Sequence, residues 1–211
     1  LLQRVQQALG GAEKIAAVKD LQYHATVEVE TPGAVMKAKQ TNFYLAPSFL
    51  RQDIELPFGK QSVYSDDTSG LLAGVQGVQA LPAQVLKQVR GEVFRQIVRL
   101  VLSDRDPDRT VNYTGSGVLD ISSKDGESAQ LEVDEKTGMP LRVSYQQAGA
   151  PGLVVEEYSD WREVGGIRLP YRWSIIQGGK KFATSSIEDY KVNSGLTTEA
   201  EHAHWTVQDF S

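Results

Sequence analysis

Short segments in which apolar and polar residues alternate recur along most of this chain. In residues 23–30 every second side chain is apolar, and the residues between them are polar or charged. That period of two is the period of a β-strand with one face buried and the other in water. The apolar face of this segment carries Tyr23, Ala25, Val27 and Val29.

Residues typical of turns separate these segments at intervals of about 8–12 residues, which is typical of an antiparallel sheet, a sandwich or a barrel. Gly165-Gly166 and Gly178-Gly179 have the length of two-residue hairpin turns. Because no repeat, linker or charge block divides the sequence, we predict a single domain over residues 1–211. Further strands are predicted at residues 35–45, 50–56, 61–65, 71–73, 118–122, 128–133, 141–145, 153–164, 167–177 and 182–192.

Two segments have the helical period instead. Residues 1–18 are amphipathic, and Gly10-Gly11 is expected to break or kink that helix. Residues 82–102 form a longer helix whose apolar residues cover far more than the roughly 100° stripe that packing on a flat sheet requires. A strongly curved sheet with this helix in its mouth would enclose the helix on more than one side. A plain hydrophobic core also contains such helices, so core and ligand pocket both stay open.

The composition excludes several classes of protein. The 211 residues include no cysteine, so disulfide scaffolds, cysteine nucleophiles and thiolate metal sites are excluded. A net charge of −5 argues against nucleic acid or an anionic membrane surface as the main partner. No apolar run approaches the roughly 20 residues of a membrane span, so we do not expect an integral membrane protein. The chain starts at Leu1 without a signal peptide, which predicts a mature fragment or a domain excised from a longer protein.

The candidate chemical motifs are weak. Asp104, Asp106 and Asp108 lack the glycine and the terminal glutamate of a calcium loop, so a solvated turn is the preferred interpretation. His202 and His204 could both reach one metal if that segment is extended, but a pair without a third ligand is a weak signal, and surface histidines are an equally good interpretation. The sequence does not place His24 beside them. The sequence contains neither a nucleophile elbow nor a His-Glu-x-x-His pair. We therefore predict no catalytic residue, no metal site and no cofactor, and a protein that is not an enzyme.

Five strand-and-turn strings follow one another along the chain, at residues 44–51, 64–67, 131–142, 158–170 and 187–196. Together they resemble the LolA/LppX-like family of periplasmic lipoprotein and lipid carriers. The resemblance spans about residues 1–200 and rests on the order and spacing of soft strand-and-turn patterns. It implies a mainly β (α+β) fold in which the sheet forms an unclosed, strongly curved antiparallel half β-barrel. It also implies that the N-terminal and central helices form a lid over a hydrophobic cavity. It also implies a periplasmic or other envelope location, or secretion.

One position departs from the family pattern. In the lipoprotein carriers, an arginine holds the lid helices closed, and it stands just before a proline. Ala46 occupies that position here. Arg51 could substitute, but it lies on a strand of different phase. Similar domains also occur as appendages of larger secreted zinc peptidases, and this chain has no peptidase motif.

Two hypotheses follow for the function. The first is an envelope carrier or binding module that holds a lipid, an acyl chain or a lipoprotein lipid moiety between the concave sheet and the central helix. The second is a non-catalytic accessory domain that binds an envelope protein and fills the cavity with its own side chains. The cavity-lining residues that we predict are Val27, Val29, Leu50, Ile54, Val89, Phe94, Ile97, Val101, Tyr171, Trp173 and Ile175.

Overall fold

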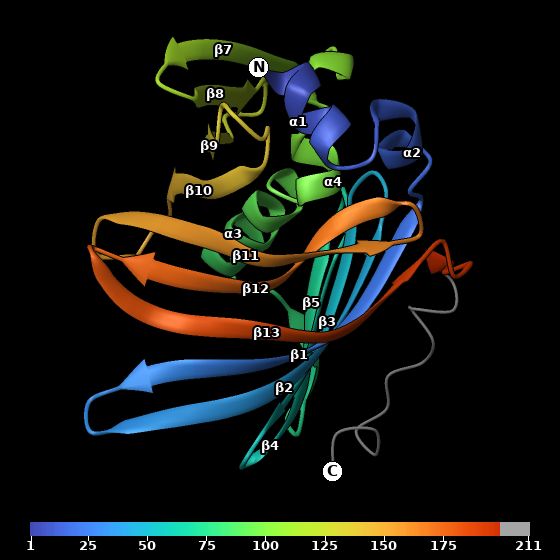
Figure 1. Ribbon diagram of the computed structural model, residues 1–211. Coiled ribbons are helices and arrows are strands. Elements are labelled where there is room, and N and C mark those ends of the chain that lie inside the picture. The colour runs from blue at the N-terminus through green and yellow to red at the C-terminus, as the bar shows by residue number, and fades with distance from the viewer. Residues whose placement is uncertain (199–211) are drawn as a thin grey trace. The chain divides into compact units, whose positions relative to one another are not determined.

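One antiparallel β-sheet of 13 strands dominates the computed structural model, which describes residues 1–198 (Figure 1). The strand order is β6-β5-β4-β3-β2-β1-β13-β12-β11-β10-β9-β8-β7. Every pairing except that of β1 with β13 therefore joins strands that follow one another in the chain. β6 and β7 are the edges, so the sheet is open, and the predicted open antiparallel sheet with accompanying helices is confirmed.

The strands agree closely with the predicted segments, and the predicted segments 153–164 and 167–177 coincide with β11 and β12. β6 and β7 were not expected from the sequence. β6 is short and mostly exposed, so its sequence carries no alternation to detect. The strands are β1 Asp20–Thr31, β2 Ala34–Leu45, β3 Phe49–Leu56, β4 Gly59–Ser65, β5 Gly70–Gly74, β6 Gly77–Ala80, β7 Arg109–Gly115, β8 Val118–Ser123, β9 Ser128–Val133, β10 Pro140–Gln146, β11 Leu153–Val164, β12 Ile167–Gln177 and β13 Lys180–Val192.

The helices are shorter than predicted. The helix at the N-terminus is divided at Gly10-Gly11, as expected, because Gly10 has φ +117° and a Cβ there would lie 2.6 Å from the Gly166 carbonyl oxygen. The prediction of one continuous helix over residues 82–102 is wrong. It is interrupted at Gln96, whose ψ of 121° is extended. The helices are α1 Leu2–Ala8, α2 Ala12–Ala16, α3 Ala83–Phe94, α4 Ile97–Leu100 and the 3-10 turn η1 Ser103–Arg105.

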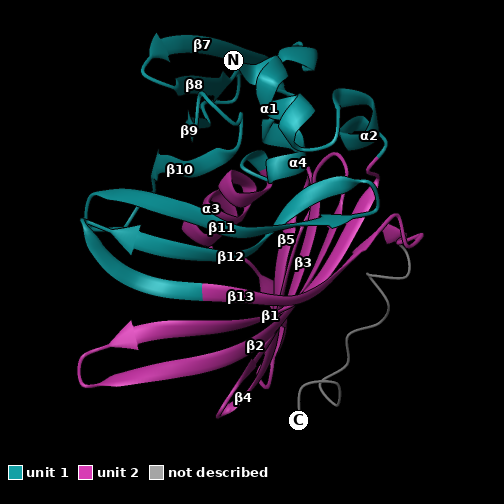
Figure 2. Cartoon of the chain, in the orientation of Figure 1, with its two compact units in different colours: residues 1–17, 94–184 teal, residues 18–93, 185–211 magenta. Residues whose placement is uncertain are grey.

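The chain divides into two compact units (Figure 2). Unit 1 consists of residues 1–17 and 94–184, and unit 2 consists of residues 18–93 together with the chain from residue 185 onward. β13 begins in unit 1 and ends in unit 2. The prediction of a single domain stays a prediction.

In unit 1, one face of β8–β12 supplies the core. Leu119, Leu131 and Val143 are opposite one another on successive strands, and each is at most 2% exposed. The buried apolar residues of α1 and α4 complete this core. Gln6 of α1 donates a 2.9 Å hydrogen bond to the Val101 carbonyl, which ties α1 to the end of α4. We call this side of the sheet the core face of unit 1.

In unit 2, α3 lies against one face of β1–β5. Gln52 of β3 donates a 2.6 Å hydrogen bond to Glu92 of α3. Gly70 of β5 has no room for a Cβ, which would lie 2.6 Å from a Leu86 methyl group. The buried residues Leu21, Tyr23, Tyr44 and Leu50 occupy this side, which we call the α3 face of unit 2.

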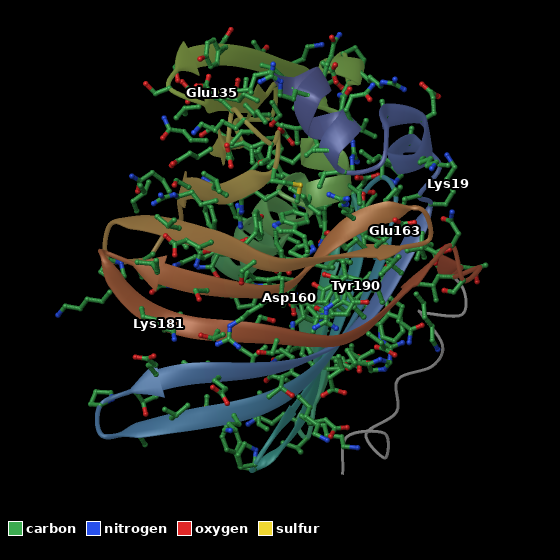
Figure 3. The ribbon with its side chains drawn as sticks, in the orientation of Figure 1. Lys19, Glu135, Asp160, Glu163, Lys181 and Tyr190 are labelled. Atoms are coloured by element: carbon green, nitrogen blue, oxygen red, sulfur yellow. The ribbon has the colours of Figure 1, made fainter. Side chains whose placement is uncertain are left out.

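The start of β1 is fastened to the residues that follow β13. The buried Asp20 carboxylate accepts hydrogen bonds from the backbone N–H groups of Ser194, Gly195 and Leu196 and from the Ser194 hydroxyl, at 2.8–3.3 Å. In the other direction, Asn193 Oδ1 accepts a hydrogen bond from the backbone N–H of Lys19 at 2.7 Å. Figure 3 labels Lys19, the residue before β1. Asp20 therefore satisfies several hydrogen-bond donors where the start of β1 meets the residues that follow β13.

We expect Asp20→Ala to lower the free energy of unfolding by about 2–3 kcal/mol, because buried donors lose a charged acceptor. Urea denaturation of the variant and the wild type measures the difference. Glu163→Ala, at an exposed position on β11, is the control and should change the stability by less than about 0.5 kcal/mol. An equal effect of the two substitutions would contradict the anchoring role.

Candidate functional site

The apolar residues on the α3 face of unit 2 continue beyond the part that is buried. On β1, Tyr23 and Ala25 are buried, whereas Val27 and Val29 are half-buried. On β3, Leu50 is 1% exposed and Ile54 is half-buried. The cross-strand register places these residues on the same face, which also includes Ala38 of β2. An apolar strip is therefore left partly uncovered, and Val89, buried on α3, lies on the covering helix.

Amide side chains interrupt this apolar strip. Asn42 is 1% exposed and accepts a 3.0 Å hydrogen bond from Gln40 on the same strand. Gln52 lies directly opposite Asn42 and bonds to Glu92, as described above. By its spacing along β3, Gln52 shares a face with Leu50 and Ile54. These amides give the α3 face fixed hydrogen-bonding groups among aliphatic side chains.

A groove of about 180 Å³ lies at the tips of the β3–β4 and β5–β6 hairpins. Leu56 and Leu72, which line it, lie on the α3 face, whereas Phe58 in the first hairpin turn is 78% exposed. For comparison, an apolar cavity of about 150 Å³ suffices to bind benzene. No local pattern in the sequence indicates this groove, because Pro57, Phe58 and Gly59 are typical of a turn. We call it the hairpin groove.

Three predicted site residues lie within the core of unit 1. Phe94, Ile97 and Val101 are 5%, 8% and 0% exposed. The guanidinium of Arg109 lies 4.3 Å from the centre of the Phe94 ring. These residues pack as ordinary core in the described structure, and ligand contact with them stays a prediction.

The three predicted residues of β12 are less covered. Tyr171, Trp173 and Ile175 are half-buried and continue the face on which Ile167 and Leu169 are buried. The Arg162 guanidinium lies 4.3 Å from the centre of the Tyr171 ring and forms an ion pair with Asp160 at 2.6 Å. Figure 3 labels Asp160 of β11. The hydrogen bond from Arg162 lowers the pKa of Asp160. A half-buried apolar strip thus exists on unit 1 as well, and a single cavity lined by both units stays a prediction.

The acidic residues after α4 are bound by local partners. Asp106 pairs with Arg99 at 3.0 Å and with Arg109 at 3.5 Å, and Asp108 pairs with Lys124 at 2.7 Å. Asp104 accepts a hydrogen bond from Gln6. This arrangement fits the predicted turn rather than a metal site. Residues 1–198 contain no group of three or more metal-ligating side chains positioned to hold an ion.

The predicted histidine candidates do not form a site in the described part of the chain. His24 is bonded to Asp189 at 2.6 Å, and this hydrogen bond lowers the pKa of Asp189. His202 and His204 lie outside the described residues. Among the helices of residues 1–198, none has the length and apolarity needed to cross a bilayer.

The largest shifts in pKa belong to a structural turn. Burial and the neighbouring Asp66 raise the pKa of Tyr64, whose hydroxyl donates a 2.7 Å hydrogen bond to Asp66. Burial by itself would raise the pKa of Asp66. Hydrogen bonds from Tyr64, Ser69 and Thr68 outweigh that effect and hold the pKa well below its usual value. The pair therefore stabilises the turn before β5.

Solved structures with the same architecture are known, although no protein-family profile and no curated protein sequence matches the chain. A DUF1329 family protein from Desulfovibrio piger has a TM-score of 0.65 and 12% identity, over 88% of this chain and 90% of that one. A LolA superfamily protein from Nitrosomonas europaea has a TM-score of 0.61 and 12% identity, over 92% and 94%.

A putative outer membrane lipoprotein-sorting protein domain from Vibrio parahaemolyticus has a TM-score of 0.59 and 8% identity, over 93% of this chain and 94% of that one. Together with the open antiparallel sheet, these similarities show that the chain has a LolA-like fold.

We expect Asp66→Asn to lower the free energy of unfolding by about 1–2 kcal/mol at pH 7, because the turn loses a charged acceptor. The pKa of Asp66 is lower in the folded state than in the unfolded chain. The Asp66 charge therefore contributes fully to the free energy of unfolding above the ordinary carboxyl pKa, and this contribution is lost as the pH falls from there towards the folded-state pKa. Urea denaturation at pH 7, 4 and 3 should show the difference between variant and wild type shrinking at pH 3. The exposed neighbour substitution Asp67→Asn is the control, and a difference that is constant with pH would exclude this role of the Asp66 charge.

Proposed function

We propose that this protein is a non-catalytic binding protein of the cell envelope that holds a lipid, an acyl chain or the lipid moiety of a lipoprotein. The observation that carries the proposal is the apolar strip that continues past the buried core on each unit. Half-buried aliphatic and aromatic residues in such a position favour an apolar ligand, because covering them removes apolar surface from water. Val27, Val29 and Ile54 would contact the ligand on unit 2, and Tyr171, Trp173 and Ile175 on unit 1.

The binding energy would come from apolar burial. Each buried methylene contributes about 0.8 kcal/mol, so about ten methylenes supply about 8 kcal/mol before the costs of ordering the ligand are subtracted. The amides of Gln40, Asn42 and Gln52 would bind an ester or amide group of the ligand.

The similar solved structures support the location and class of ligand. One is described as a lipoprotein-sorting domain and another as a LolA superfamily protein. An envelope location fits a carrier of this kind. The net charge of −5 gives no reason to expect nucleic acid, and the proposal requires no cofactor.

The proposal does not include the arginine latch that the family resemblance implies. Ala46 has no side chain that could form it. Arg51 pairs with Asp53 at 2.9 Å and lies over the Phe43 ring, on the side of the sheet opposite α3. Any closure over a ligand would rest on other contacts.

For unit 2, we expect Ile54→Gln to weaken binding of the neutral fluorescent probe N-phenylnaphthylamine by about tenfold, because a polar amide replaces apolar contact surface. Glu55→Gln places the same side chain on the opposite face of β3 and should leave the affinity unchanged. Fluorescence titration measures both, and native mass spectrometry tests whether the purified protein carries a lipid. Absence of any probe binding to the wild type would overturn the proposed function.

For unit 1, Trp173→Gln is expected to weaken binding of the same probe by about tenfold or more, because Trp173 offers a large aromatic surface. The matched variant Arg172→Gln changes the neighbouring exposed residue of β12 and should bind like the wild type. If Trp173→Gln binds normally while Ile54→Gln does not, the ligand contacts unit 2 alone.

A second candidate function is a protein-interaction domain of a larger envelope protein. It is favoured by the exposed apolar side chains of Phe58, Val75 and Val78 at or beside the hairpin groove, which are 78%, 63% and 47% exposed. This alternative gains if the wild type binds no probe and carries no lipid, while Phe58→Ser abolishes a protein complex recovered from the native cell envelope.

A further inference from the structure

Arg95 is a buried cation, and part of its guanidinium has no partner among residues 1–198. It follows α3 and precedes the break at Gln96, and the residue is 8% exposed. Its Nε atom is buried and has no hydrogen-bond partner within the described chain. Buried charges in proteins are normally paired, because desolvating a cation is costly. A buried donor that lacks a partner therefore calls for a functional explanation.

The surroundings of Arg95 are aromatic and lie on the core face of unit 1. Its guanidinium carbon is 3.4 Å from the centre of the Tyr145 ring on β10. The Tyr145 hydroxyl donates a 2.7 Å hydrogen bond to Glu156 on β11, and no ion pair joins Glu156 to Arg95 among the described residues. The nearby carboxylate is thus engaged by a tyrosine, and no carboxylate of residues 1–198 forms an ion pair with Arg95.

The same face leads directly to the half-buried apolar strip of unit 1. Glu156 is opposite Ile175 on β12, and Val154 of β11 is opposite both Tyr145 and Gln177. Tyr145 is therefore two strand spacings, about 10 Å, from β12. An elongated amphiphile along Trp173 and Ile175 could place its head group at Arg95.

We propose that Arg95 binds the anionic head group, a carboxylate or a phosphate, of an amphiphilic ligand whose chain lies on the apolar strip of unit 1. This inference rests on the proposed function, and it adds the charge of the ligand. The planar guanidinium offers paired N–H donors that match the oxygens of either group. The anion supplies both the counter-charge and the acceptor that the buried Nε lacks. The Tyr145 ring holds the guanidinium in place by a cation–π contact when no ligand is present.

The test compares three ligands with the same oleyl chain and different heads. Oleate, oleoyl lysophosphatidate and the neutral oleyl alcohol each displace N-phenylnaphthylamine from wild type, Arg95→Met and Arg90→Met. Arg95→Met keeps an apolar stem of similar length and removes the charge. Arg90→Met changes an exposed arginine of α3 and is the matched control.

We expect wild type and Arg90→Met to bind at least one anionic ligand about 10- to 100-fold more tightly than the alcohol. Arg95→Met should lose that preference and retain the affinity for oleyl alcohol. Preference for oleate assigns a carboxylate head, and preference for lysophosphatidate assigns a phosphate head. Arg95→Lys, which keeps a positive charge, should retain part of the preference and serves as the second variant if Arg95→Met does not fold.

Three results would overturn the inference. If wild type binds the alcohol as tightly as both anions, Arg95 does not select charge. If Arg95→Met, or Arg95→Lys in its place, weakens all three ligands equally, the residue has a structural role only. If no oleyl ligand binds the wild type, the inference fails together with the proposed function, whereas the first two results leave the proposed function standing.

Discussion

The pairing of long antiparallel strands is the constraint on which the rest of this structure depends. Five strands contain 11–13 residues each, namely β1, β2, β11, β12 and β13. The longest helix of residues 1–198, α3, also contains 12 residues, and α1 contains 7. A strand rises about 3.3 Å per residue and a helix only 1.5 Å, so twelve residues of strand extend about 40 Å and twelve of helix about 18 Å. Within unit 2, α3 is therefore much shorter than β1 and β2, and Val27 and Val29, beyond the buried part of β1, stay half-buried.

Polar groups on the covered faces give this apolar surface its chemical character. Asn42 and the Gln52–Glu92 bond lie on the α3 face of unit 2, and Arg95 lies on the core face of unit 1. A face built only to fill a core would gain stability from aliphatic residues at these positions, since buried polar groups cost free energy unless they are fully paired. Retaining them is consistent with a surface that orients a ligand with a polar head and an apolar chain.

Much of the fold could be predicted from local patterns, and less of the candidate site. The alternation in residues 167–177 located β12, where Ile167 and Leu169 are buried and Arg168 and Arg172 are exposed. β7 was not predicted from the sequence because most of its side chains are exposed. The break between α3 and α4 was not predicted, because neither Arg95 nor Gln96 is a helix breaker and their helix propensities gave no signal. The hairpin groove escaped because turn chemistry does not reveal which apolar side chains gather around a turn.

The sequence by itself determined which side chains share a face, since alternation is a property of neighbours in the chain. It placed Val27 with Val29 and Trp173 with Ile175 before any tertiary contact was considered. Only the tertiary structure decided how far each face is covered, that Phe94 and Val101 lie within the core of unit 1, and that Arg51 lies opposite α3. It alone placed Arg95, buried, against the Tyr145 ring with no ion-pair partner among residues 1–198. Burial and charge pairing depend on residues far apart in the chain, and no local pattern records those contacts.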